Sequence, residues 1–481
     1  MSLLLRRFVV GTPLSLALLA AASVVACAST GSEPPAKAAP TPPPGAETAA
    51  VVESQSGTIT DEETAEVDEQ VRIVLRQGDV LADADGLPVT GLGLAVTDGN
   101  GLLAFTGALD DEGTIDSFVW RDGALIWRAS DVKGPGPGGL SPLMGSGNEG
   151  QFVFQTMVRG KDALWSQEGL LMTRGQVAPG MGEGSEILLS RASTMTPDGT
   201  AHWVSEFQDA PGAKGKGRVL YRSPGASPEA IEIVLRSDQE VGGQPIARPY
   251  GLDFNYQVSD NGEHLIQVLV LATGSPTNDD AVYLDGEIAL REGEAIDQEE
   301  SWDRFGRVAI NDQGDYLAVV TTDAPNVKDL VVVYNGEVAL REGKSLDGVS
   351  LAAQAQVLAV TLDNDGRAAH LWSVGGFGSE YLFFACDAAN LADSVLVLKT
   401  GQPLQEKDGN RVVIKKFSDV GHGPALSLGP GSFLYAEVSL GDKSLPPDTG
   451  PLESIVGLAL PECPPPADAA GGAEIAGTAQ P

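Results

Sequence analysis

The stretch Arg307–Gly343 reads RVAI-NDQG-DYLAVVTTDAPNVKD-LVVVY-NG-EVALREG, and it decides the fold. Four short runs rich in Val, Leu, Ile and Tyr are separated by turn residues, which is the pattern of antiparallel hairpins. The pair Asn335-Gly336 is the strongest of these signals, because a type I′ turn needs positive φ at both central positions. This stretch therefore predicts a four-stranded meander.

Two landmarks of this meander recur along the chain. The first is a strand that ends in a basic residue, at Arg76, Arg128, Arg174, Arg236, Arg291, Arg341 and Lys399. The second is a tip of the form polar-x-x-Gly before an apolar strand, starting at Asp98, Gly147, Thr196, Ser259, Asn311, Asp363 and Leu428. Four-stranded repeats at this period are typical of a β-propeller. We therefore predict an all-β propeller of four-stranded antiparallel blades, seven in number.

The two ends of the repeat array complement each other. The strand Val71–Arg76 has no tip before it, and the last unit ends with a third strand, Glu453–Leu460, and no fourth. Pairing these two segments would complete the last blade and remove two exposed sheet edges. We expect the N-terminal strand to close the ring in this way.

Two tips carry a resemblance to a known family. Asp98–Phe105 (DGNGLLAF) and Asn311–Ala318 (NDQGDYLA) resemble the NxxGxxAF tandem-repeat proteins of bacterial envelopes, whose repeats stand behind a choice of anchors. The first tip has Asp for Asn, and the second has Leu-Ala for Ala-Phe. The resemblance extends from Val71 to about Pro461. It implies a propeller-like architecture and an envelope location, and it implies no activity.

The N-terminal residues form an export signal. Arg6-Arg7 precede the apolar run Phe8–Val25, and Val24-Val25-Ala26-Cys27 resembles the lipobox of bacterial lipoproteins. A basic region, an apolar region and a small residue before a cleavage point are the parts of a secretory signal. The resemblance implies cleavage before Cys27, lipidation of its thiol, and sorting to the outer membrane, on its periplasmic or surface face.

The chain therefore divides into four segments. Residues 1–26 form the lipoprotein signal peptide, 27–69 a Pro- and Ala-rich disordered linker, 70–463 the repeat domain, and 464–481 a disordered tail. The linker cannot bury apolar surface, so it acts as a semi-extended spacer. The net charge of −35 makes nucleic acid a poor partner for the folded part.

The predicted meander also separates two faces of the ring. The Gly tips and the turns between third and fourth strands lie on one face, which we call the tip face. The second-to-third loops and the blade crossovers lie on the other, the loop face, and include the long segments Ser237–Leu252 and Glu292–Phe305. Irregular loops on a rigid scaffold are common binding surfaces. We expect binding on the loop face, through Arg248, Tyr250, Trp302 and Arg304, unless the aromatic rings are core caps.

Other candidate sites are weaker. The serial arginines could ring an anion site, but we expect them to serve the repeat itself, through ion pairs or carbonyl contacts between blades. The turns Asp83–Gly86 and Asp363–Gly366 resemble calcium loops, but Asp and Asn also favour tight turns, so we expect no metal or other cofactor. The four histidines, His202, His264, His370 and His422, fall at unrelated offsets from the tips and should not converge on a metal. Cys386 and Cys463 each follow a third strand in neighbouring units, so a disulfide is an open possibility.

No catalytic motif of the GxSxG or HExxH type occurs in the sequence. The sequence therefore favours a monomeric, lipid-anchored, non-catalytic module that binds an envelope protein or a polysaccharide. The alternative is a secreted propeller enzyme, a hydrolase or lyase acting on glycan or lactone substrates.

Overall fold

The computed structural model describes residues 70–464, except 82, 133–143, 211, 213–214, 325–327, 353, 376–378, 407–408, 419–425, 430–432 and 443–449. Cys27, the predicted leader and linker, and most of the predicted tail lie outside the described residues. The described residues belong to one compact unit, Thr64–Pro481. No helix in this part of the chain is long and apolar enough to cross a membrane.

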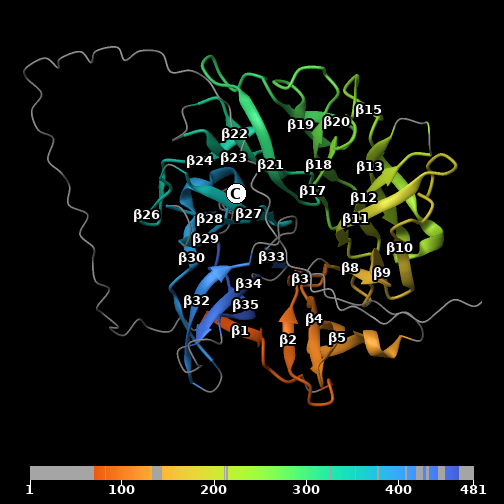
Figure 1. Ribbon diagram of the computed structural model, residues 1–481. Helices are drawn as coiled ribbons and strands as arrows, with labels where there is room; N and C mark the ends of the chain where they lie inside the picture. The colour runs from red at the N-terminus through yellow and green to blue at the C-terminus, as the bar shows by residue number, and fades with distance from the viewer. Residues whose placement is uncertain are drawn as a thin grey trace, which may run out of the picture. The chain divides into compact units, whose positions relative to one another are not determined.

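Seven four-stranded antiparallel sheets stand in a ring as the blades of a propeller, as predicted (Figure 1). The first strands are β2 with β3 (Val89–Leu92, Val96–Thr97), β7 (Met144–Ser146), β11 (Glu186–Met195), β17 (Leu252–Val258), β21 (Trp302–Ile310), β27 (Gln356–Leu362), and β32 with β33 (Arg411–Phe417, Leu426–Gly429). The second strands are β4 (Leu103–Asp111), β8 (Phe152–Val158), β12 (Ala201–Gln208), β18 (Leu265–Val270), β22 (Tyr316–Thr322), β28 (Ala368–Ser373) and β34 (Phe433–Asp442).

The outer half of each blade follows the same order. The third strands are β5 (Thr114–Arg121), β9 (Lys161–Ser166), β13 (Lys216–Ser223), β19 (Asp280–Leu284), β23 (Leu330–Tyr334), β29 (Glu380–Ala385) and β35 (Leu452–Ala459). The fourth strands are β6 (Ala124–Arg128), β10 (Gly169–Thr173), β14 (Glu232–Arg236), β20 (Glu287–Arg291), β24 (Glu337–Arg341), β30 (Val395–Lys399) and, in the last blade, β1 (Val71–Arg76). Every strand expected to end in a basic residue is thus an outermost strand.

The ring closes between its first and last strands. β1 pairs antiparallel with β35, and Val71 lies opposite Leu458. In Figure 1 the orange-red β1 lies beside the blue β35. The predicted closure is confirmed by this pairing.

The core is divided among the blade interfaces. β22 shows why: Leu317 and Val319 pack toward the next blade, whereas Ala318 and Val320 pack toward the preceding one. Successive side chains of a strand point to opposite faces of its sheet, and here both faces are buried. This explains why β22 begins as a continuous apolar run and does not alternate with polar residues.

The blade crossovers are more regular than the sequence suggested. Five of the described crossovers fold back on themselves, each through a short hairpin or a single bridge. The bridges are Val80↔Pro88, Val177↔Glu186 and Ala295↔Ser301. The hairpins are β15 with β16 (Glu240–Val241, Gln244–Pro245) and β25 with β26 (Ser345–Leu346, Val349–Ser350). Before the last blade, β31 (Pro403–Gln405) pairs with β32 in the same manner. The 3₁₀ turns η1 (Ala129–Asp131), η2 (Pro224–Ala226), η3 (Pro228–Ala230) and η4 (Ala388–Asp393) complete the elements. The loop face is therefore built from repeated hairpins.

Candidate functional site

Three of the Gly tips are held by the side chain of their first residue, an Asn or an Asp. Asn311 Oδ1 accepts hydrogen bonds from the backbone N–H groups of Gln313 (3.1 Å) and Asp315 (2.9 Å). Gly314 has φ +80°, a conformation that a residue with a Cβ adopts at a cost. Asp98 and Asp363 cap their tips in the same way. An Asn or Asp first and a Gly fourth are thus dictated by backbone geometry.

Neighbouring tips are also bonded to one another. Asp312 Oδ1 accepts from the N–H of Asn261 in the preceding blade (2.7 Å). Asp312 Oδ2 accepts from Asn364 Nδ2 in the next blade (2.8 Å), and its own N–H donates to Asn364 Oδ1 (2.8 Å). The Asp312 carboxylate is therefore a structural link across three blades.

These tips surround one end of a cavity of about 310 Å³ on the ring axis. Its wall is made by the first strands of all seven blades and by some of the tips, with Val96, Met144, Met195, Tyr256, Ile310 and Leu428 among the lining residues. A volume of this size lies at the lower end of the range for small-ligand sites. Tip residues therefore contribute to the cavity wall, whereas the sequence predicts binding on the loop face.

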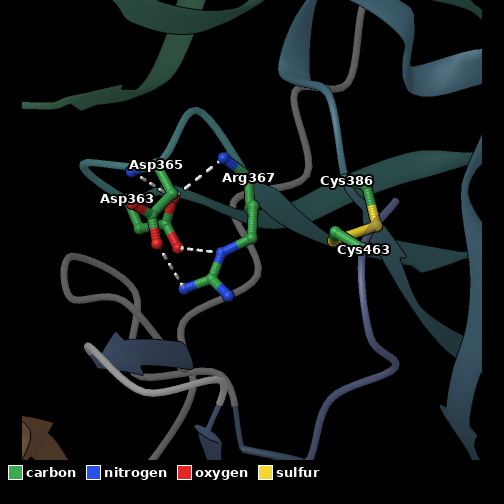
Figure 2. Close-up of a disulfide and its surroundings, with 5 residues drawn as sticks. All are labelled: Asp363, Asp365, Arg367, Cys386 and Cys463. Carbon is green, nitrogen blue, oxygen red and sulfur yellow. Dashed lines mark hydrogen bonds and ion pairs between the residues drawn. A yellow bond between two sulfur atoms is a disulfide. The ribbon is translucent and has the colours of Figure 1, made fainter. Parts of the chain in front are cut away.

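Most charges around the cavity are neutralised by a partner. Arg121 donates to Asp98 Oδ2, and Arg367 Nε donates to Asp363 Oδ2 at 2.6 Å. Arg367 also contacts Asp365 (3.2 Å), and Figure 2 shows these three residues of one tip turned toward each other. In the candidate calcium turn Asp363–Gly366, the Asp363 carboxylate is thus engaged by Arg367 and by backbone N–H groups. No group of three possible metal ligands occurs among the described residues.

Asp260 differs from the other charged residues of the wall. Its carboxylate has no hydrogen bond or ion pair with any residue that the structure describes. The side chain is open to water at the cavity mouth, but the wall around it withholds part of the carboxylate's hydration. This desolvation, together with the nearby Asp312 charge, raises the pKa of Asp260 to about 6.

Of the predicted binding residues, Trp302 does not fit the prediction. It begins β21 and is 5% exposed, packed among Ile266, Val282 and Leu290 between two blades. Large aromatic side chains are buried by default unless their surroundings are polar. Trp302 is therefore a core residue, and the core-cap alternative considered from the sequence describes it.

Arg248 is occupied by structural contacts. Its Nε donates to Asp238 Oδ2 and its Nη1 to Asp209 Oδ2, both at 2.6 Å, and the guanidinium lies 5.3 Å above the centre of the Phe207 ring. These contacts use the guanidinium to hold a crossover against the preceding blade. Arg248 and Trp302 are thus both occupied by contacts within the domain, and neither side chain is available for the predicted binding.

The remaining two predicted residues stay exposed. Tyr250 is 55% exposed, with the Arg218 guanidinium 4.8 Å from its ring centre. The Arg304 side chain is 79% exposed and lies 3.9 Å from Asp303. The structure therefore leaves two of the four predicted loop-face residues free to contact a partner.

The arginines of the outer strands pair mostly within a blade. Arg128 donates to Asp85, and Arg341 donates to Glu300, in the hairpins that enter their own blades. Arg76 makes the same contact with Glu406. The hydrogen bonds from Arg341 lower the pKa of Glu300. The expectation of contacts between blades is replaced by a clamp between an outer strand and its incoming crossover.

The histidines do not converge within the described residues. His370 accepts from Trp372 Nε1 at its Nδ1 (2.7 Å), so its Nε2 donates to Ser394 Oγ (2.8 Å). Burial lowers the pKa of His370 to about 3, so the ring is neutral. His264 pairs with Asp285 at 2.7 Å in another blade, and His422 lies outside the described residues.

Cys386 and Cys463 form a disulfide, which lies near the Asp363 tip (Figure 2). Their Cα atoms are 5.4 Å apart, within the range that a disulfide requires. Cys386 directly follows β29, but Cys463 lies four residues beyond the end of β35. That extension lets the chain reach the neighbouring blade, which equivalent strand ends would not.

Comparisons with known proteins extend to the fold alone. No protein-family model matches the sequence, and no curated protein matches it. Among solved structures, a puromycin hydrolase mutant complexed with PGG is similar over 76% of this chain and 53% of its own length (13% identity, TM-score 0.40). Prolyl oligopeptidase B from Galerina marginata is similar over 76% of this chain and 51% of its own length, with 10% identity and a TM-score of 0.39. An α-L-arabinanase from Penicillium chrysogenum is similar over 77% of this chain and 98% of its own length, with 11% identity and a TM-score of 0.32. The chain spans about half the length of the first two.

Proposed function

We propose that this protein is a non-catalytic binding module of the bacterial cell envelope that holds a small ligand in its axial cavity. The observation that carries the proposal is the cavity itself, whose wall takes residues from every blade. A site on rigid strands needs little ordering when a ligand enters, which favours affinity. The Asp98, Asn311 and Asp363 tips have their backbone fixed by Asx caps, which adds rigidity at that end of the cavity.

The residues of the wall support binding more than chemistry. No histidine, cysteine or lysine occurs among the described residues that line the cavity. Nucleophilic catalysis needs a nucleophile within hydrogen-bond reach of a base, and the described wall brings no such pair together. The enzyme alternative, a hydrolase or lyase on glycans or lactones, would be revealed by turnover of such a substrate.

The cellular location is also part of the proposal. We place the protein outside the cytoplasm, held to the outer membrane by acylated Cys27. The disulfide between Cys386 and Cys463 supports export, because such bonds persist in oxidising compartments. The Pro-rich linker would let the domain stand away from the lipid surface.

A thermal-shift screen of small molecules tests the proposal on the full chain purified in detergent. Thr194 lines the cavity and is half-buried, so Thr194→Trp should fill part of the space. The matched control is Tyr250→Ala with Arg304→Ala on the loop face. Ligands that raise Tm for the wild type and the control, but not for Thr194→Trp, would support the cavity. Ligands lost only in the control would contradict it.

A second candidate site rests on the exposure of Tyr250 and Arg304. An exposed aromatic ring and an exposed guanidinium suit a protein or polysaccharide partner. Pull-down from envelope extract should then lose a partner in the Tyr250→Ala, Arg304→Ala protein and keep it in Thr194→Trp. Capture of the same set by both variants would remove this candidate.

A further inference from the structure

The axial cavity contains one carboxylate without an ion-pair partner among its described residues, that of Asp260. Asp98 pairs with Arg121, and Asp363 and Asp365 share Arg367. Arg307, the other arginine of the wall, is engaged by a neighbouring group as well. The cavity therefore presents one unpartnered carboxylate that is free to meet a cation.

The acidic neighbour of Asp260 does not compete for that cation. Both carboxylate oxygens of Asp312 accept hydrogen bonds, from the Asn261 backbone and from Asn364 Nδ2. The Asp312 charge adds to the negative potential at Asp260 without leaving an oxygen aimed at a ligand. Two carboxylates close together favour a cation between or beside them.

The wall beyond Asp260 combines apolar side chains with hydroxyl and amide groups. Val96, Met144, Met195, Ile310, Leu362 and Leu428 line the channel. These apolar side chains favour an alkyl or aromatic body, because burying apolar surface stabilises the complex by roughly 25 cal/mol per Å². A fully hydrated metal ion would gain nothing from these side chains.

We propose that the cavity binds a small organic cation, with an ammonium group beside Asp260 and a short apolar body in the channel. This inference rests on the proposed function, because it names the ligand class of the same cavity. An ammonium donating to a carboxylate forms a charge-assisted hydrogen bond, about twice as strong as a neutral one. The net charge of −35 raises the local concentration of cations around the mouth.

The proposal has a pH signature of defined sign. A proton and an ammonium compete for the same carboxylate, so affinity should rise as pH increases through the Asp260 pKa of about 6. The other charged groups of the wall are Asp98 from the first blade, Arg307 from β21, and Asp363, Asp365 and Arg367 from the β27–β28 tip. Asp312 faces Asp260 from the β21–β22 tip. No histidine lies among the described residues of the wall.

The test is calorimetric titration of the full chain with hexylamine at pH 7.5, with hexanol and hexanoate as uncharged and anionic counterparts. We expect binding of hexylamine alone, reduced about tenfold or more in Asp260→Asn, as the loss of a charge-assisted hydrogen bond requires. Glu263→Gln is the matched control, since it removes a carboxylate of the same tip that does not line the cavity. That variant should bind within about twofold of the wild type.

Three results would overturn the inference. They are no hexylamine binding, equal affinity in Asp260→Asn, or equal binding of hexanol and hexanoate. The proposed function is tested separately, by the thermal-shift screen with Thr194→Trp. If other ligands still lose their thermal shift in Thr194→Trp, the cavity remains the site and only the ammonium class is wrong. If no ligand depends on Thr194, both fail.

Discussion

Val71, the first residue of β1, lies opposite Leu458 of β35 in antiparallel register. The pairing continues beyond the strand, because Ala459 donates to the Gln70 carbonyl (3.0 Å) and Gln77 donates to the Glu453 carbonyl (2.9 Å). The N-terminal strand of the domain is therefore the outermost strand of the last blade. The two ends of the repeat domain depend on each other for a complete sheet.

Deleting Val71–Arg76 should destabilise the whole ring. Val71 and Leu75 are each 8% exposed, and their loss removes apolar burial together with a row of backbone hydrogen bonds. The expected loss in unfolding free energy is on the order of several kcal/mol. Chemical denaturation measures it, with Arg72→Ala as the control within the same strand. Unchanged unfolding after the deletion would show that β1 does not close the ring.

The disulfide should stabilise the fold by reducing the conformational entropy of the unfolded chain. It joins residues 77 positions apart, so Cys463→Ser should cost about 2–4 kcal/mol. Thiol counting under denaturing, non-reducing conditions provides the direct check, in a Cys27→Ser background. We expect no free thiol in that protein and one after Cys463→Ser. Two free thiols in the Cys27→Ser protein would disprove the bond.

Glu437 should make the protein less stable as pH rises. It is 4% exposed in β34, its Oε2 has no partner within the described residues, and burial raises its pKa from 4.5 to about 7. The folded state therefore binds this proton more tightly than the unfolded state does. Stability contributed by the protonated form is lost between about pH 4.5 and 7, on the order of 3 kcal/mol for that shift.

Glu437→Gln removes this titration while keeping the side-chain volume. The variant should exceed the wild type in unfolding free energy at pH 8 and lose that advantage by pH 5. Glu263→Gln, on an exposed tip, is the control and should follow the wild type. A parallel pH profile of Glu437→Gln and wild type would contradict the assignment.

The order of the strands could be predicted from the sequence because the deciding signals are local. Asn311 caps its own tip and Gly314 needs its own positive φ, so the tip is recognisable in each copy whatever its neighbours are. The closing strand was recognisable for a related reason: Val71–Arg76 has the pattern of a fourth strand and no blade of its own.

The site could not be predicted in the same way. Trp302 and Tyr250 have similar sequence surroundings, but one is packed between blades and the other is exposed, which depends on the neighbouring sheet. Asp260 occupies the same place in its tip as Asp312 does in the next one. Only the contacts between blades make the Asp312 carboxylate a link and leave that of Asp260 free. A weak signal was present in the first strands, whose residues must line the axis of any propeller.

Lipidation of Cys27 is a separate prediction of the sequence. Full-length protein expressed in a bacterium should incorporate a labelled fatty acid, and Cys27→Ser should abolish the labelling. Each buried CH₂ of an acyl chain adds roughly 0.8 kcal/mol to membrane anchoring. Cys463→Ser serves as the control that keeps the leader intact. Labelled Cys27→Ser protein would refute the lipoprotein assignment.

The most direct test of the cavity uses the methionines as reporters. Met144 and Met195 line the axial cavity, whereas Met157 is 47% exposed at the end of β8 near the loop face. In protein labelled with ¹³C at the methionine methyl groups, titration with hexylamine or a ligand from the screen should shift the Met144 and Met195 resonances and leave Met157 unchanged. Shifts at Met157 with Met144 and Met195 unmoved would place binding on the loop face and contradict the account.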